Sequence, residues 1–134
     1  MTKKIAVTKI TIFRKKEIRK TIHKNEWWFV VNDVVEALTD TPNVKDYIKK
    51  MRKRDEELSK GWGQFVTPLS VHTTGGSQSL NCANTEGIFR IIQSIPSPKA
   101  EPFKRWLALE QKSGKKVLTR ENYLQKTQSK KLLN

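Results

Sequence analysis

A change in hydrophobic period, from two residues to about 3.6, constrains this fold more than any other feature of the sequence. Residues 5–13 are rich in β-branched side chains, residues 18–23 alternate apolar with polar side chains, and residues 27–31 form a short apolar run. Polar breaks at residues 14–17 and 24–26 are typical of turns. The three runs therefore predict an antiparallel β-meander.

Helical spacing begins after the meander. Asn32 or Asp33 can cap a helix that residues 39–42, Thr-Asp-Thr-Pro, bring to an end. A second helix is predicted over residues 43–54, because four apolar residues recur at the i, i+3, i+4, i+7 spacing of a buried helix face. These residues are Val44, Tyr47, Ile48 and Met51. Residues 61–63, Gly-Trp-Gly, are then expected to form a loop.

A second hairpin is predicted in the middle of the chain. Residues 64–72 and 78–83 read as strands, and they flank Thr-Thr-Gly-Gly-Ser at residues 73–77, which is a strong turn signal. Pro68 places the first of these strands at a sheet edge or at a bulge, because proline has no N–H to donate to a ladder.

Two more helices complete the predicted domain. Asn84 caps the third, which has a stripe of four isoleucines, and Ser97-Pro98 starts a fourth, which Ser113-Gly114 stops. The order βββαα-ββ-αα indicates the α+β class, a small antiparallel sheet packed with about four helices. We expect residues 1–111 to form this domain. Apolar residues are sparse in residues 112–134, so this basic extension is predicted to be largely disordered.

Several classes of protein are excluded. A single cysteine, Cys82, rules out an intramolecular disulfide framework and a Cys-x-x-Cys metal site. No apolar run reaches the roughly 18 residues of a membrane span, and Lys9 and Arg14 interrupt any start that resembles a signal peptide. We expect a soluble, cytoplasmic protein in a reducing compartment. A metal would need His23, His72 and Cys82 to converge with a carboxylate, so no metal and no other cofactor is predicted.

Signatures of catalysis are weak. The glycine-containing stretch 74–77 lacks the spacing and the following helix of a phosphate-binding loop. A Cys82–His72 nucleophile pair across the second hairpin would have no third group to orient it. Residues 55–57, Asp-Glu-Glu, are interpreted as a solvated helix end. The chain is therefore not predicted to be an enzyme.

Basic residues carry the functional signal. The chain has 27 Lys and Arg against 13 Asp and Glu, for a net charge of +14, and residues 1–111 and 112–134 are both basic. A helix that is basic over its exposed face suits phosphate binding, because each cation that neutralises a phosphate releases counterions. Candidate nucleic-acid-binding residues on the helix 43–54 and the first hairpin are Lys45, Lys49, Lys50, Arg52, Lys53, Arg54, Arg14, Lys15, Lys16, Arg19 and Lys20.

Tryptophans allow two interpretations. In a loop, Trp62 could pack on a sugar or a base, whereas strand alternation puts one of Trp27 and Trp28 in the core and the other over a neighbouring helix. The apolar face of the helix 43–54 lacks the Trp- and Leu-rich character of a membrane-insertion face. We therefore expect nucleic acid as the partner and no membrane, and charge alone does not choose between DNA and RNA or between duplex and single strand.

Three stretches of this sequence resemble the Bro-N domain, which is the N-terminal module of baculovirus Bro proteins and of phage and prophage antirepressors. They are residues 26–40 (EWWFVVNDVVEALTD), 46–54 (DYIKKMRKR) and 83–108 (ANTEGIFRIIQSIPSPKAEPFKRWLA). The third is similar to the bacterial branch, which includes damage-inducible protein D. Four basic residues match family positions and would extend a basic surface, namely Arg90, Lys99, Lys104 and Arg105, although Arg90 could instead pair with Glu86 one helical turn earlier.

The resemblance implies DNA binding and transcription regulation by antirepression, with no catalytic residues. Bacterial relatives continue after residue 108 into a longer helical region, so we expect a Bro-N module with a short basic extension and without the second domain of those relatives. Two hypotheses remain open. The chain is either a DNA-binding regulatory module or a protein-interaction module that binds a phage or host repressor without contacting nucleic acid.

Overall fold

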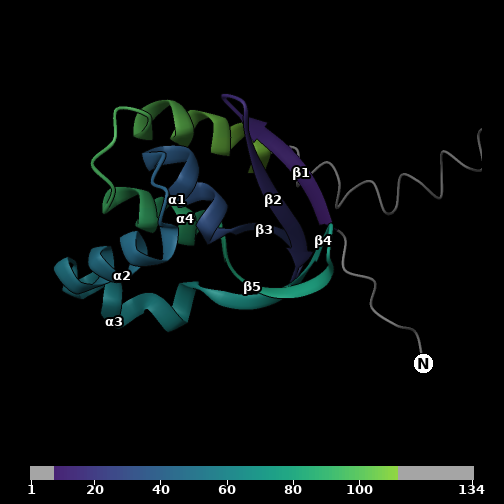
Figure 1. Ribbon diagram of the computed structural model, residues 1–134, viewed down its shortest axis with the longest axis horizontal. Helices are drawn as coiled ribbons and strands as arrows, with labels where there is room; N and C mark the ends of the chain where they lie inside the picture. Colours follow the sequence, from purple (N-terminus) through teal and green to yellow (C-terminus); the bar gives the residue numbers. More distant parts are fainter. Residues whose placement is uncertain (1–7, 112–134) are drawn as a thin grey trace, which may run out of the picture.

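A curled antiparallel sheet organises the molecule, and the computed structural model describes it within residues 8–111 (Figure 1). Five strands lie in the order β1-β2-β3-β5-β4, and every neighbouring pair is antiparallel. The strands are β1 (Thr8–Phe13), β2 (Lys16–His23), β3 (Glu26–Val30), β4 (Thr67–Thr73) and β5 (Gly76–Asn84). The predicted meander and the second hairpin are confirmed.

Tight turns connect the strands of the meander. Arg14 and Lys15 have φ values of 46° and 69°, and Lys24 and Asn25 have φ values of 51° and 62°. Two left-handed residues in succession are the signature of a type I′ turn, whose twist matches that of the flanking strands. Pro68 lies in β4, the strand at one edge of the sheet, as its missing N–H predicts.

Five helices accompany the sheet within the described residues. They are α1 (Val31–Thr39), α2 (Val44–Arg54), α3 (Glu56–Phe65), α4 (Thr85–Gln93) and a helix over residues 100–111. The α+β class is confirmed, but the order has one helix more than predicted. Residues 5–7, the expected helix stop at 113–114 and the whole extension 112–134 lie outside the described residues.

The additional helix is α3, so the prediction of a loop at residues 61–63 was wrong. Residues 55–57 do lie at the end of α2, and Glu56 and Glu57 are exposed as predicted, but they also start α3. The Asp55 carboxylate accepts the Leu58 N–H at 3.0 Å and so caps α3 at its start. Two glycines in a helix cost about 1 kcal/mol each relative to alanine. Burial of Leu58 (0% exposed) and Trp62 (8% exposed) outweighs this cost. Because Phe65 is still helical, β4 begins only at Thr67.

Two other helix starts also differ from expectation. Neither Asn32 nor Asp33 caps α1, which begins at Val31 directly after β3 and has no side-chain cap. The last helix begins at residue 100 instead of at Ser97-Pro98. Ser97 holds the chain just before it, because its hydroxyl donates to the Leu38 carbonyl at 2.6 Å and accepts the Lys99 N–H at 3.1 Å.

Both faces of the sheet carry buried side chains. Trp27 joins the main core with α1, α4 and the helix 100–111, in which Phe103 and Leu107 are fully buried. Trp28 points to the other face, where it packs with Val30, Val71 and Cys82. The expectation that the second tryptophan would cover a helix was therefore wrong. The sheet curls around this smaller cluster, and the His72 N–H on β4 reaches the Thr8 hydroxyl on β1 at 3.0 Å.

A candidate nucleic-acid interface

The α2 helix presents its cations in a regular row. Asn43 caps it by accepting the Asp46 N–H at 3.1 Å, and Met51 anchors its inner face in the core with 0% exposure. Lys45, Lys49 and Lys53 recur every four residues and are exposed. This spacing keeps the three ammonium groups on one side of the helix.

A depression of about 500 Å³ between α2 and α3 gathers these cations. Its lining consists of Lys45, Ile48, Lys49, Arg52, Lys53 and Ser59, so it contains four positive charges and no carboxylate. Within the described residues, none of the three lysines has an acid within 4.0 Å. A depression of this kind attracts a polyanion and repels a cation.

Arg52 forms the floor of the depression. Its guanidinium lies 4.6 Å from the centre of the Trp62 ring, and its Nε is buried without a hydrogen-bond acceptor in the described part of the chain. Stacking on an aromatic face fixes the guanidinium and leaves it charged. Trp62 itself is buried under Arg52 in α3, so the expectation that it packs on a sugar or a base from a loop was wrong.

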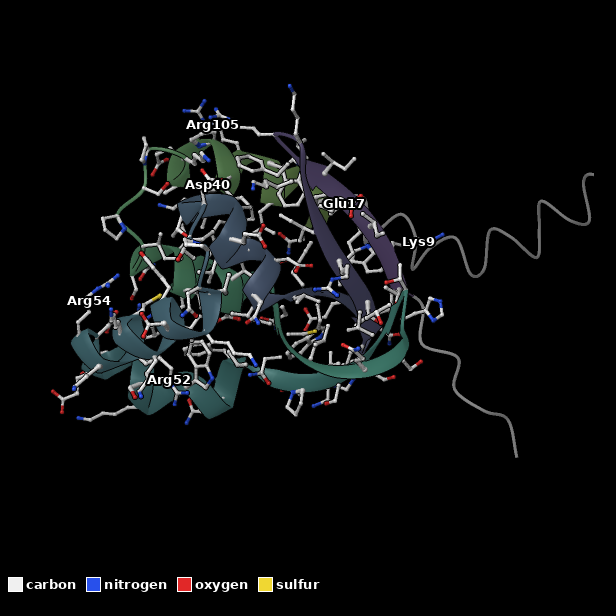
Figure 2. All side chains as sticks on the ribbon, viewed as in Figure 1. Lys9, Glu17, Asp40, Arg52, Arg54 and Arg105 are labelled. Atoms are coloured by element: carbon white, nitrogen blue, oxygen red, sulfur yellow. The ribbon has the colours of Figure 1, made fainter. Side chains whose placement is uncertain are left out.

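The other two basic residues of α2 point elsewhere. Lys50 pairs with Asp46 at 3.0 Å. Arg54 donates to the Ser94 carbonyl at 2.5 Å and lies 5.7 Å from the Tyr47 ring, which turns it toward α4. In Figure 2, Arg52 lies low on the molecule between α2 and α3, and Arg54 lies at the far end of α2. The predicted basic helix therefore contributes four of its six cations to the depression.

Three basic residues of the first hairpin form ion pairs with acidic residues of other elements. Lys20 is 6% exposed, its Nζ lies 3.5 Å from Glu110, and it packs 4.4 Å from the Trp27 ring centre. Burial lowers the pKa of Lys20, and Glu110 opposes this shift. Lys20 is therefore not accessible to a phosphate, and its assignment to the interface was wrong.

Arg19 and Lys16 are paired with residues of α1 and of the turn after it. Arg19 donates to the Asp33 carboxylate from its backbone N, Nε and Nη2 at 3.0, 2.8 and 2.7 Å. Hydrogen bonding to Asp33 raises the pKa of Arg19. Lys16 lies 3.7 Å from Glu36 and 3.3 Å from Asp40. The acids of α1 thus neutralise a hairpin that the sequence presented as basic.

The remaining hairpin cations form a second, smaller basic surface. Arg14 and Lys15 are exposed in the β1–β2 turn, which packs on the helix 100–111 through Phe13. Arg105 is exposed on that helix, whereas Lys104 pairs with Glu101 at 3.0 Å. This surface lies at the top of the molecule in Figures 1 and 2, far from α2, so the hairpin and α2 do not form one continuous track.

Two further cations of the third stretch also bind acids. Arg90 contacts Asp55 at 3.1 Å, and not Glu86, which was the alternative partner considered from the sequence. Lys99 contacts Asp40 at 2.5 Å. Hydrogen bonds from the Ser94 hydroxyl, the Leu58 N–H and Arg90 lower the pKa of Asp55 to about 2. These contacts tie the α2–α3 junction to α4 and leave little charge for a ligand. The sequence gives no signal for either pair, since Asp55 stands beside two other acids and the paired residues are 35 and 59 positions apart.

The hypothetical nucleophile pair is not assembled. His72 lies opposite Ser77 and Cys82 opposite Thr67, so the two side chains are five residues apart along the hairpin, or about 16 Å. Burial raises the pKa of the Cys82 thiol to about 12. In residues 8–111 no group of three or more His, Cys, Asp or Glu is placed to hold a metal ion. None of the described helices is long and apolar enough to cross a membrane.

Comparison with known proteins gives a family. The model of the BRO family, N-terminal domain, matches residues 17–118, which is about three quarters of the chain and includes the whole of α2 and α3. No curated protein and no solved structure matches the chain. Since the match covers four of the five strands, the described helices and the basic depression, and leaves out β1, the chain belongs to the BRO family through its N-terminal domain.

Proposed function

We propose that this chain is a DNA-binding regulatory module of the phage and prophage antirepressor type, and not an enzyme. The observation that carries the proposal is the depression between α2 and α3, which has four cations and no acid in its lining. Membership of the BRO family supports the same function. None of Arg14, Lys15 and Arg105 lines the depression, and Figure 2 shows Arg105 on the opposite side of the view from Arg52.

Phosphate groups are the chemical feature that the depression would recognise. Lys45 and Lys53 are eight residues apart, so they span about 12 Å of helix. The major groove of B-DNA is also about 12 Å wide, which allows α2 to reach phosphates on both sides of it. With Trp62 covered by Arg52, the depression offers no exposed ring for base stacking. We therefore expect duplex DNA to bind at least as tightly as single-stranded DNA.

The test is fluorescence anisotropy with labelled duplex and single-stranded DNA between about 50 and 300 mM salt. Four phosphate contacts predict a slope of log K against log salt of about −3.6. The variant Lys49→Gln/Lys53→Gln should reduce the slope by about 1.8 and weaken binding about 60-fold at 0.1 M salt. Both lysines are exposed, so folding should be unchanged.

The matched control is Lys9→Gln/Lys24→Gln, which removes the same charge from exposed positions outside α2. This control should bind with nearly the parental slope. Equal losses in both variants would mean that net charge, not the depression, drives binding. Weak binding with a flat salt dependence at the lowest salt would refute the proposal.

A further inference from the structure

Exposed apolar side chains gather around one strand. Among residues 8–111 the exposed large hydrophobic residues are Ile10 (58%), Ile12 (59%) and Leu109 (64%). Ile10 and Ile12 flank Thr11 on β1, and Leu109 precedes Glu110, which accepts a hydrogen bond from the Thr11 hydroxyl. Successive strand side chains alternate between faces, so Ile10 and Ile12 lie on the face of β1 opposite this contact with the helix 100–111. An apolar surface of this kind does not bind DNA phosphates, which are charged.

The same strand has an unoccupied edge within the described part of the chain. β1 is the first strand in the sheet order and pairs only with β2. In the described residues β4 is not paired with β1, and its His72 N–H donates to the Thr8 side-chain hydroxyl and not to the β1 backbone. Residues 9–13 therefore present a row of backbone groups to which another strand can add.

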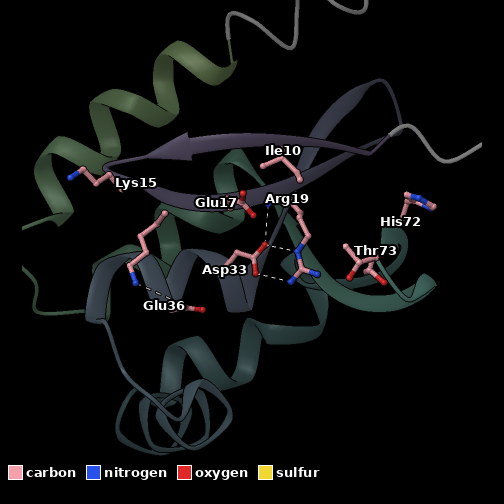
Figure 3. Close-up of a pocket in the computed structure, with 10 residues that line it drawn as sticks. Ile10, Lys15, Glu17, Arg19, Asp33, Glu36, His72 and Thr73 are labelled. Atoms are coloured by element: carbon pink, nitrogen blue, oxygen red, sulfur yellow. Dashed lines mark hydrogen bonds and ion pairs between the residues drawn. The ribbon is translucent and has the colours of Figure 1, made fainter.

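A cavity of about 610 Å³ adjoins this edge (Figure 3). Ile10 lies on one side of it, His72 and Thr73 lie on the other, and the Arg19–Asp33 ion pair lies between them. Ile10 and Arg19 face each other across β1 and β2. A side chain from an added strand could enter this cavity beside Ile10, since adjacent strands are only about 5 Å apart.

Charge around the edge selects the occupant. Lys9 lies at one end of the edge and Arg14 and Lys15 lie at the other, all exposed and without an acid within 4.0 Å in residues 8–111. Three acids also line the cavity: Asp33 and Glu36 are paired with Arg19 and Lys16, and Glu17, opposite Ile12, has no cation within 4.0 Å in residues 8–111. A second copy of this chain would bring the same cations to the edge and a net charge of +14, which repels it. An acidic strand is attracted.

We propose that the free edge of β1 binds an extended acidic segment of a partner protein as a sixth strand of the sheet. Alternate apolar residues of that segment pack on Ile10 and Ile12, and acidic residues on its other face meet Lys9. Arg14 and Lys15 hold the acidic end of the segment beside the β1–β2 turn. This site lies apart from the α2–α3 depression and does not depend on DNA binding.

The test uses a fluorescein-labelled seven-residue peptide of alternating Glu and Val as the probe, with fluorescence polarisation as the readout. A block peptide with the same residues, three Val followed by four Glu, is the control for charge alone. We expect saturable binding of the alternating peptide and at least tenfold weaker binding of the block peptide. Hydrogen exchange should show new protection of the amides of residues 9–13 when the alternating peptide is bound.

Two variants separate this site from the DNA site. Ile10→Thr/Ile12→Thr keeps β-branched residues but removes the apolar surface, and should weaken peptide binding about tenfold while leaving the salt slope for DNA unchanged. Lys49→Gln/Lys53→Gln should do the reverse. Equal binding of both peptides, or loss of peptide binding in the lysine variant, would overturn the proposal. A fall of more than about 4 °C in the Tm of Ile10→Thr/Ile12→Thr would also overturn it, because the isoleucines would then be packed against their own chain.

Discussion

Replacing Lys20 by methionine distinguishes a buried ion pair from a phosphate-binding lysine, because the two roles predict opposite results. A lysine that contacts DNA would reduce the salt slope by about 0.9 and leave folding unchanged. In the structure the Lys20 side chain is 7% exposed, its partner Glu110 is 15% exposed, and their charged atoms are 3.5 Å apart. We therefore expect a change in stability and no change in the salt slope.

The size of the effect follows from this geometry. At 3.5 Å and an effective dielectric constant of about 20, the Coulomb attraction is about 5 kcal/mol. Desolvation of the two ions offsets most of this, so the pair contributes little net stability. Removing one partner is different. Glu110→Gln leaves Lys20 charged and buried, at a cost of about 3 kcal/mol. Lys20→Met leaves Glu110 with its Thr11 hydrogen bond and some solvent, and should cost about 1 kcal/mol.

The assay is a double-mutant cycle by urea unfolding. The double variant Lys20→Met/Glu110→Gln should recover most of the loss, which gives a coupling energy of about 2–3 kcal/mol. Burial lowers the pKa of Lys20 in the folded state below 10.5, so between these two pKa values the unfolded chain keeps the Lys20 proton and the folded chain releases it. The free energy of unfolding should then rise as the pH rises toward 10.5, and Lys20→Met should remove this rise. A coupling below about 0.5 kcal/mol would place the pair in solvent and refute the reasoning.

Three other predictions test the packing. Gly87→Ala should lower the free energy of unfolding by about 1–3 kcal/mol in the urea assay, because the new Cβ would lie 2.8 Å from the Phe65 carbonyl oxygen. Gly63→Ala should raise the free energy of unfolding by up to about 1 kcal/mol, because its Cβ would meet nothing within 4 Å. Asp55 has a folded-state pKa of about 2, so the stability that it contributes is present above the unfolded pKa of 3.8 and is lost as the pH falls toward 2. Asp55→Asn keeps the capping oxygen and should flatten the fall of Tm between pH 3.8 and 2. If the Tm of this variant falls with acid as steeply as that of the parent, the network with Ser94 and Arg90 is contradicted. Cys82 should react with an aromatic disulfide reagent only after unfolding, since its thiol is fully buried and its pKa is raised to about 12, and rapid reaction of the native protein would contradict this burial.

Local patterning determined most of the elements. β-branched and alternating runs predicted β1 and β2, and a short apolar run predicted β3. The Gly-Gly signal predicted the β4–β5 turn, and the 3.6-residue stripe predicted α2 with its cationic outer face. Asn84 caps α4 by accepting the Gly87 N–H, as its side chain predicts. These features depend on residues within one or two turns of each other, so a sequence encodes them directly.

Helix α3 shows where local propensity fails. Gly61 and Gly63 indicate a loop when only the neighbouring residues are considered. Tertiary packing reverses this, because Leu58 and Trp62 bury their side chains against residues that are distant in the chain. The candidate site depends on this reversal, since Ser59 on α3 lines the depression and the buried Trp62 ring supports Arg52, which also lines it.

The basic character of the chain and the amphipathic pattern of α2 can be read from the order of residues, but the cations that stay available to a ligand follow from contacts in the folded chain. Lys20 meets an acid 90 positions later, and Arg19 meets one 14 positions later. Lys49 and Lys53 are the same residue type as Lys20 and also stand among other basic residues in the sequence, yet they face the depression instead of the core. Charge pairing acts across space over a few ångströms, whereas the sequence orders residues only along the chain.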